Sequence, residues 1–166
     1  MSSKPVVGIL MGSDSDLAVM REAESALKTL GVPCEMTISS AHRTPERTGE
    51  YAKTAVKRGI KVIIAGAGSA AHLAGFVAAH TPLPVIGVPI DSGPLKGLDA
   101  LLATVQMPGG VPVASMALGK AGARNAGIFA AQILAVSDKA LAKRLASYKK
   151  TLARQVEEKA RKLKDG

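Results

Sequence analysis

Short apolar runs alternate with stretches of helical periodicity along most of the chain. The apolar runs are bounded by glycine, proline or polar residues and predict buried strands at residues 6–11, 33–38, 61–65, 85–88 and 111–116. Apolar residues spaced three or four apart predict helices at about 15–30, 45–58, 70–80, 96–105, 121–136 and 139–163. Strands that are apolar throughout and alternate with helices are typical of a parallel sheet covered on both faces. We therefore expect an α/β fold, namely a three-layer αβα sandwich around a parallel sheet, with an extra C-terminal helix.

The last predicted helix differs from the others because it is strongly basic. Residues 138–166 carry 10 of the 22 Lys and Arg residues and 4 of the 13 Asp and Glu residues, so +6 of the net charge of +9 lies there. One apolar stripe runs along it, through Leu141, Leu145, Tyr148, Leu152, Val156, Ala160 and Leu163. We interpret it as a helix that packs on the body or on a neighbouring subunit. A nucleic-acid or membrane surface is the weaker alternative, since no aromatic residues interleave to stack bases.

Length and composition are those of one globular domain. The chain has 166 residues, of which 47% are hydrophobic and 21% are charged. We expect a single domain over residues 1–166, with its core at about 5–137 and the basic helix at about 138–164. Aromatic residues make up only 2% of the chain. The core must therefore be built from Ala, Val, Ile, Leu and Met.

Several absences in the sequence bear on location and cofactors. Cys34 is the one cysteine and lies in an apolar run, which indicates a buried, inert thiol and a reducing compartment. Residues 1–5 are too short and polar for a signal peptide, and no uninterrupted apolar stretch of about 18 residues predicts a membrane span. We expect a cytoplasmic protein. No spacing typical of metal ligands occurs, so we expect no metal site.

Candidate chemistry is expected in the loops that follow strands, because ligands of open α/β sheets bind beyond the carboxyl ends of the strands. The first such loop reads Gly12-Ser13-Asp14-Ser15-Asp16. Its serines and aspartates are good helix caps, and the helix end beside them presents free N–H groups to an anion. The loop either binds a ligand, with Asp16 accepting hydrogen bonds from sugar hydroxyls, or only caps the next helix.

The second loop, residues 39–45, contains a His-Arg pair. Histidine as a residue type suits proton transfer near neutral pH, which makes His42 a candidate general acid and base. Arg43 suits a phosphate group, which a guanidinium binds through two N–H groups at once. Pro45 is placed to open the following helix. A proton-transfer and anion-binding site is the favoured interpretation, and a plain surface turn is the alternative.

The third loop, residues 65–75, is rich in small residues and includes His72. Small residues let the backbone approach a ligand closely and leave room for a small, dry pocket. His72 is either a ligand contact or a capping and packing residue. His80 has no such surroundings in the sequence and is expected to be a helix-end residue.

Taken together in this order, the motifs resemble those of class I N5-carboxyaminoimidazole ribonucleotide mutases of purine biosynthesis. The matching segments lie at residues 11–16, 40–45, 66–73, 84–89, 105–113 and 119–123. The resemblance extends from about residue 6 to residue 138. It implies a flavodoxin-like parallel sheet and a homo-oligomer, usually an octamer, whose sites lie at subunit boundaries and whose last helix reaches a neighbour.

The resemblance also implies residue roles. His42 is expected to be the catalytic general acid and base, Arg43 to bind the phosphate, and Ser13 and Asp16 to hold the phosphoribosyl group. Residues 68–72 are expected to line the pocket for the migrating carboxyl group. The full set of substrate-binding residues implied is Ser13, Ser15, Asp16, Ser40, Arg43, Gly68, Ser69, Ala70 and His72.

The expected reaction needs no metal and no cofactor. His42 would protonate the exocyclic nitrogen of the substrate and release carbon dioxide, ring carbon C4 would attack that carbon dioxide, and His42 would then remove the C4 proton. The first alternative is a class II enzyme that carboxylates aminoimidazole ribonucleotide with free carbon dioxide. A flavin-binding module of the same fold is disfavoured by the shortage of aromatic residues, and a nucleic-acid binder by the charge distribution.

Overall fold

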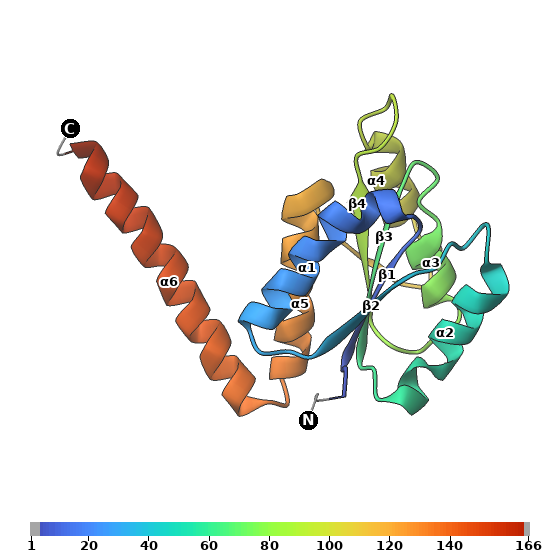
Figure 1. The fold of residues 1–166 in the computed structure, drawn as a ribbon, viewed down its shortest axis with the longest axis horizontal. Helices are drawn as coiled ribbons and strands as arrows, with labels where there is room; N and C mark the ends of the chain where they lie inside the picture. The colour runs from blue at the N-terminus through green and yellow to red at the C-terminus, as the bar shows by residue number, and fades with distance from the viewer. Residues whose placement is uncertain (1–3, 165–166) are drawn as a thin grey trace.

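The computed structural model describes residues 4–164, in which a five-stranded parallel sheet lies between two layers of helices (Figure 1). The strands follow the order β2-β1-β3-β4-β5 across the sheet. Their bounds are β1 (Val7–Met11), β2 (Cys34–Ile38), β3 (Val62–Gly68), β4 (Val85–Ile90) and β5 (Ala114–Ser115). Every strand pair is parallel, as the sequence pattern predicted. The α/β sandwich is therefore confirmed.

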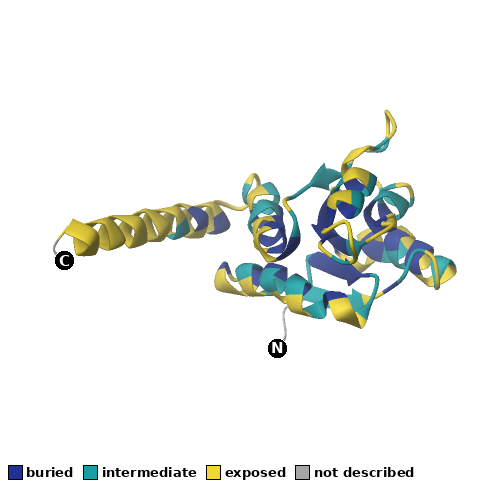
Figure 2. Ribbon diagram, turned by 90° about the horizontal axis from the view of Figure 1, so that it is seen from above, coloured by how far each residue is buried: buried dark blue, intermediate teal, exposed yellow. Residues whose placement is uncertain are grey.

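The helices cover both faces of the sheet. Helices α1 (Leu17–Thr29) and α5 (Gly119–Ala135) pack on one face, and α2 (Pro45–Arg58), α3 (Leu73–Ala78) and α4 (Leu98–Val105) pack on the other. Successive strand residues point to opposite faces, so Ile9 and Ile64 join the first core while Leu10 and Ile63 join the second. All four side chains are fully buried. The central strands are accordingly coloured as buried in Figure 2.

Helices α1 and α5 approach each other closely because their contact consists of small residues. Ala23 of α1 and Ala126 and Ala130 of α5 are fully buried there. A Cβ atom added at Gly127 would lie 2.6 Å from the carbonyl oxygen of Ala23. The glycine therefore allows the close approach of the two helices. Helix α1 directly follows the first loop, so this packing also anchors the C-terminal end of that loop.

Most predicted bounds agree with the structure to within two residues, and three elements differ by three residues at one end. The fifth strand contains only Ala114–Ser115, not residues 111–116, because Pro112 lacks an N–H group to donate to a neighbouring strand. Strand β3 continues to Gly68, so the first part of the predicted third loop belongs to the sheet. Helix α3 begins at Leu73, not residue 70, because Ser69 has a left-handed φ of 50° that ends the strand in a turn.

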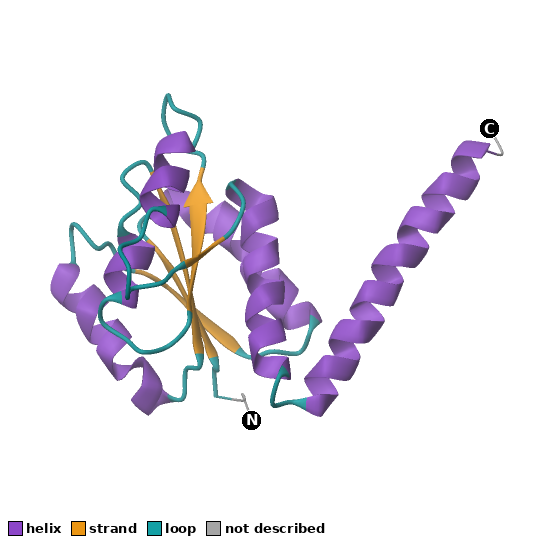
Figure 3. Cartoon of the chain, turned by 180° about the vertical axis from the view of Figure 1, so that it is seen from behind, coloured by secondary structure: helices purple, strands orange, loops and turns teal. Residues whose placement is uncertain are grey.

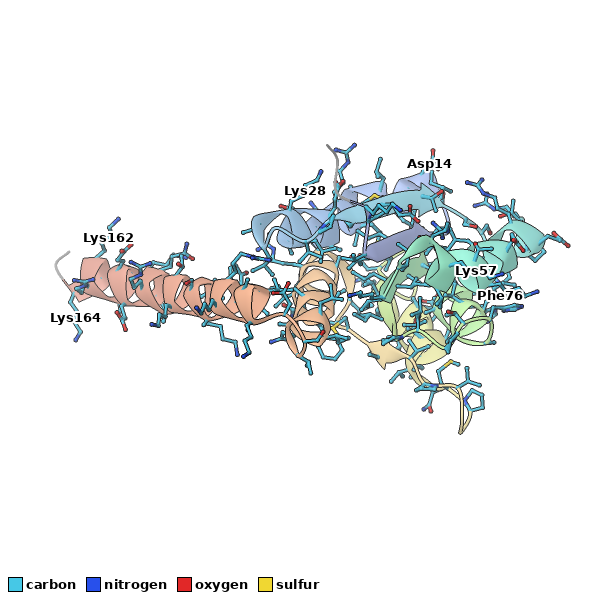
Figure 4. The ribbon with its side chains drawn as sticks, turned by 90° about the horizontal axis from the view of Figure 1, so that it is seen from below. Asp14, Lys28, Lys57, Phe76, Lys162 and Lys164 are labelled. Carbon is cyan, nitrogen blue, oxygen red and sulfur yellow. The ribbon has the colours of Figure 1, made fainter. Side chains whose placement is uncertain are left out.

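Helix α6 (Lys139–Lys164) leaves the body at one end of the molecule (Figure 3). Its first two turns pack on the body through Leu141 and Leu145, which are 2% and 7% exposed. Farther along, the same apolar stripe is uncovered, since Leu152, Val156 and Leu163 are 43%, 68% and 86% exposed. Basic side chains surround this outer half (Figure 4).

Two further observations bear on the sequence-based expectations. Cys34 is half-buried on β2 rather than fully buried, and burial raises the pKa of its thiol, which disfavours the reactive thiolate. Among the helices of residues 4–164, none combines the length and the apolar character needed to cross a membrane.

Candidate active site

Four loops meet at the carboxyl ends of β1, β2, β3 and β4 and enclose a cleft of about 310 Å³. Because the strands are parallel, all their carboxyl ends lie at the same edge of the sheet, where open α/β proteins bind ligands. The cleft is lined by Gly12, Ser13, Ser15, Asp16, Ser40, Ala41, His42, Arg43, Ala67, Gly68, Ala70, Leu73 and Ser92. The three loops singled out from the sequence thus come together, and a fourth joins them.

The loop after β1 forms a short 3-10 helix, Asp14–Asp16, whose N-terminus is capped by two reciprocal hydrogen bonds. The Ser13 hydroxyl accepts the Ser15 N–H at 3.4 Å, and the Asp16 carboxylate accepts the Ser13 N–H at 3.1 Å. This reciprocal arrangement is a capping box, which fixes the turn. Capping and lining of the cleft are therefore combined in the same residues, and they are not alternatives.

The two carboxylates of this loop have opposite electrostatic surroundings. Asp16 is 6% exposed, and its desolvation raises the pKa, although the hydrogen bond from the Ser13 N–H opposes the shift. Asp14 points into solvent (Figure 4), and the hydrogen bond from the Ser13 hydroxyl lowers its pKa. A buried carboxylate with a raised pKa favours ligand groups that donate hydrogen bonds, such as sugar hydroxyls.

The loop after β2 is held by hydroxyl groups of the helix that follows it. The Ser40 carbonyl oxygen accepts hydrogen bonds from the hydroxyls of Thr44, at 3.0 Å, and Thr48, at 3.2 Å. Buried Ser39 and Thr48 join their hydroxyls at 2.7 Å beneath the loop. The network fixes residues 40–44 at the start of α2, so the exposed side chains between them project from a rigid base.

Arg43 joins the first and second loops. Its Nη2 donates a hydrogen bond to the Gly12 carbonyl oxygen at 2.8 Å. A guanidinium carries five N–H donors, so this bond leaves others for an anion in the cleft. The side chain is exposed and lies beside the capped serine turn.

His42 and His72 form a pair across the cleft edge, although 30 residues separate them in sequence. The Nε2 of His42 and the Nδ1 of His72 are 2.8 Å apart, and the rings meet edge-on at 89°. His72 makes no side-chain cap to α3, and its contact with His42 is one that neither of the two alternatives from the sequence included. His80 stacks on Phe76 and bonds its carbonyl oxygen, as expected of a helix-end residue.

The third loop meets an element that sequence analysis missed. The hydroxyls of Ser69 and Ser92 are 3.3 Å apart, and Ser92 belongs to the loop after β4. Ser69 and His72 do not line the cleft themselves, but each contacts a residue that does. The rule that ligands bind beyond strand ends applies equally to β4, and it would have led to Ser92.

The groups that line the cleft are of the kinds that can transfer protons and bind an anion. An imidazole, a guanidinium, several hydroxyls and one buried carboxylate face a common space. Within residues 4–164, no three His, Cys, Asp or Glu side chains gather as they would around a metal ion. The groups suit a phosphorylated, hydroxyl-bearing ligand whose reaction moves protons.

Comparison with known proteins shows to which family this site belongs. The family model for AIR carboxylase matches residues 6–155, which include every loop of the cleft. The chain belongs to the AIR carboxylase family.

Relatives with curated names agree with the AIR carboxylase assignment. The N5-carboxyaminoimidazole ribonucleotide mutase of Pyrococcus horikoshii is 57% identical over 164 residues, covering 99% of this chain and 92% of that protein. The mutase of the same name from Bacillus subtilis is 61% identical over 142 residues, covering 86% of this chain and 88% of that protein. The crystal structure of Treponema denticola PurE superposes with a TM-score of 0.86 at 34% identity, covering 96% of this chain and 99% of that chain.

Proposed function

We propose that the chain is a class I N5-carboxyaminoimidazole ribonucleotide mutase of de novo purine biosynthesis, an isomerase that forms 4-carboxy-5-aminoimidazole ribonucleotide. Relatives that bear this mutase name are 53–61% identical to the chain, and several span nearly all of it. The observation that carries the proposal is the cleft itself, in which His42 and Arg43 face the Ser13–Asp16 turn. An acid–base residue thus lies within one nucleotide's reach of anion-binding groups.

The phosphoribosyl part of the substrate binds where the first two loops meet. Arg43 and the Ser13 and Ser15 hydroxyls hold the phosphate, and Asp16 accepts hydrogen bonds from the ribose. The hydrogen bond from Arg43 to the Gly12 carbonyl oxygen supports this assignment, because it already holds the guanidinium beside the serine turn. Ser40 positions the second loop, and its hydroxyl accepts the Arg43 N–H at 3.2 Å.

The chemistry needs one proton carrier and a place that retains carbon dioxide. Cationic His42 gives its proton to the exocyclic nitrogen, the nitrogen–carboxyl bond breaks, and carbon dioxide is released beside the ring. Ring carbon C4 supplies the electron pair for the new carbon–carbon bond, and neutral His42 then removes the C4 proton. The histidine returns to its starting state, so no metal or cofactor takes part. Such proton transfer typically contributes about 10²–10⁴-fold to the rate.

His72 acts on this cycle through His42. The 2.8 Å contact joins the His72 Nδ1 to the His42 Nε2, so the tautomer of one ring sets which nitrogen of the other carries a proton. Gly68 and Ala70, which flank Ser69 and precede His72, form the wall beside which the migrating carboxyl group is held. Ala70 and Gly68 line the cleft and present backbone without bulky side chains.

The working assembly is a cytoplasmic homo-oligomer, an octamer in the favoured case, that contacts neither nucleic acid nor membrane. The uncovered half of α6 supports this proposal, because its apolar stripe is available for a neighbouring copy of the chain. The body and α6 together form a single domain, since the first turns of α6 pack into the same core as α1 and α5.

An isomerisation assay with and without bicarbonate tests the function. We expect the purified protein to convert N5-carboxyaminoimidazole ribonucleotide to the C4-carboxylated product in bicarbonate-depleted buffer, faster than the reaction without enzyme. A protein that instead forms this product only from aminoimidazole ribonucleotide and added bicarbonate is a class II carboxylase. That result would overturn the mutase assignment while leaving the family intact.

A further inference from the structure

We propose that Ser92, together with Ser69, forms a hydroxyl pair that retains the carbon dioxide released during the reaction. The inference rests on the proposed mutase function and adds a residue from a fourth loop to it. Ser92 lies after β4, lines the cleft that His42 also lines, and has its hydroxyl 3.3 Å from that of Ser69. Ser92 thus adds a hydroxyl from the fourth loop to the wall of the cleft.

Gly68 shows that the fold makes room for this hydroxyl. A Cβ atom added at Gly68 would lie 2.0 Å from the Ser92 Oγ and 3.2 Å from the Ile90 carbonyl oxygen. A side chain at residue 68 would have to displace Ser92, because the Ser92 hydroxyl occupies the space that such a side chain would take. The glycine at position 68 therefore allows the Ser92 hydroxyl to lie close to β3 at the wall of the cleft.

Ser69 adds an independent observation. Its φ of 50° is a left-handed conformation that residues other than glycine rarely adopt. Such an outlier beside a cleft points to a functional constraint, because an unstrained backbone would direct the side chain elsewhere. Here the conformation accompanies the contact between the Ser69 and Ser92 hydroxyls, which follow the neighbouring strands β3 and β4.

The pair has donor capacity to spare. Each hydroxyl carries one proton, and one of the two protons is used within the pair. The other proton is free to donate to an oxygen atom of a ligand. This proton can be donated to an oxygen of carbon dioxide, of the substrate carboxylate or of the product carboxylate. The hydrogen bond slows the escape of carbon dioxide and does not change the proton balance at His42. The bonds that break and form remain the nitrogen–carbon and C4–carbon bonds of the proposed reaction.

Partitioning of the released carbon dioxide provides the test. The substrate labelled with ¹³C in its carboxyl group is converted in unlabelled bicarbonate, and spontaneous loss measured without enzyme is subtracted. We expect Ser92→Ala to raise the ratio of escaped to transferred carbon by about fivefold, the effect of one hydrogen bond. Ser69→Ala gives a similar rise, the double variant adds little to either, and Ser92→Thr restores retention.

Lys96→Gly is the matched control in the same loop. Lys96 also has a φ of 50°, does not line the cleft, and is replaced by a residue that adopts this conformation freely. A ratio within about twofold of wild type in both Ser92→Ala and Ser69→Ala, or an equal rise in Lys96→Gly, overturns the proposal. Wild-type protein that makes no labelled product at all refutes the mutase function instead, so the two failures are distinguishable.

Discussion

At the scale of single residues, the surroundings of a side chain decide what it can do in the cleft. The chain has three histidines, and only two of them meet. His42 is exposed, contacts His72 and faces the groups that suit a phosphate, whereas His80 stacks on Phe76 near the end of α3. The same imidazole group is therefore expected to be essential at one position and dispensable at another.

Substituting His42 tests the proton-transfer role. We expect His42→Asn to lower kcat by at least about 10²–10⁴-fold, because an amide makes hydrogen bonds but does not shuttle protons. Binding of the nucleotide product, measured by calorimetry, should persist. His80→Asn is the matched control and should retain nearly the wild-type rate. Equal losses in both variants would show that His42 has no special role.

Asp16 predicts a dependence of stability on pH. Its pKa in the folded protein is raised above 3.8 by desolvation, so the folded state holds the Asp16 proton more tightly than the unfolded state does. The contribution of Asp16 to the free energy of unfolding is therefore largest at acid pH and falls as the pH rises through 3.8 and the folded pKa.

The substitution Asp16→Asn isolates this contribution. The asparagine oxygen still accepts the Ser13 N–H but carries no charge. We expect the Tm of the variant, relative to wild type, to increase between about pH 3 and pH 6, while its KM for the nucleotide rises. If the Tm difference between the variant and wild type instead decreased from acid to neutral pH, the burial argument would be contradicted.

At the scale of elements, periodicity predicted the layers well and the ends of some elements poorly. Helix α2 spans Pro45–Arg58 as predicted, because proline opens it and Gly59, with a φ of 94°, closes it. These signals are local, so the sequence contains them. The late start of β5 follows from Pro112 within the predicted strand, and the late start of α3 follows from the left-handed turn at Ser69, a conformation that the sequence does not signal at a serine.

The contact between α1 and α5 gives a stability prediction at this scale. Gly127→Ala places a methyl group 2.6 Å from the Ala23 carbonyl oxygen, so the helices must separate. We expect the free energy of unfolding to fall by about 1–3 kcal/mol, measured by denaturant titration. Gly109→Ala, where nothing lies within 4 Å of the added carbon, should change it by less than about 0.5 kcal/mol. Similar losses in both variants would refute the close-contact explanation.

At the scale of the whole molecule, the parallel sheet brings distant loops to one edge. That convergence could be predicted, because the carboxyl ends of parallel strands meet there, and nearly all the candidate residues line or adjoin one cleft. Individual contacts across it could not. The pairings of His42 with His72 and of Ser69 with Ser92 depend on the relative heights of neighbouring strands, which periodicity does not give.

Helix α6 leads to a prediction about assembly. Leu152→Glu combined with Val156→Glu places charges in the uncovered apolar stripe. We expect the mass measured by light scattering to fall below that of the wild-type oligomer. The control, Ser147→Glu combined with Thr151→Glu, adds the same charge at exposed polar positions of α6 and should leave the mass unchanged. A wild-type protein that is itself monomeric would contradict the proposed assembly.

The fate of the carboxyl carbon distinguishes recapture of carbon dioxide within the cleft from capture of carbon dioxide from solution. The substrate, labelled with ¹³C in its carboxyl group, is converted by the wild-type protein in buffer that contains unlabelled bicarbonate, and the product is analysed by mass spectrometry. We predict that nearly all of the product carries the label on C4, because carbon dioxide is released and recaptured beside His42 within the same cleft. Product that carries mainly unlabelled carbon would contradict the account, since the carbon dioxide would then have come from solution.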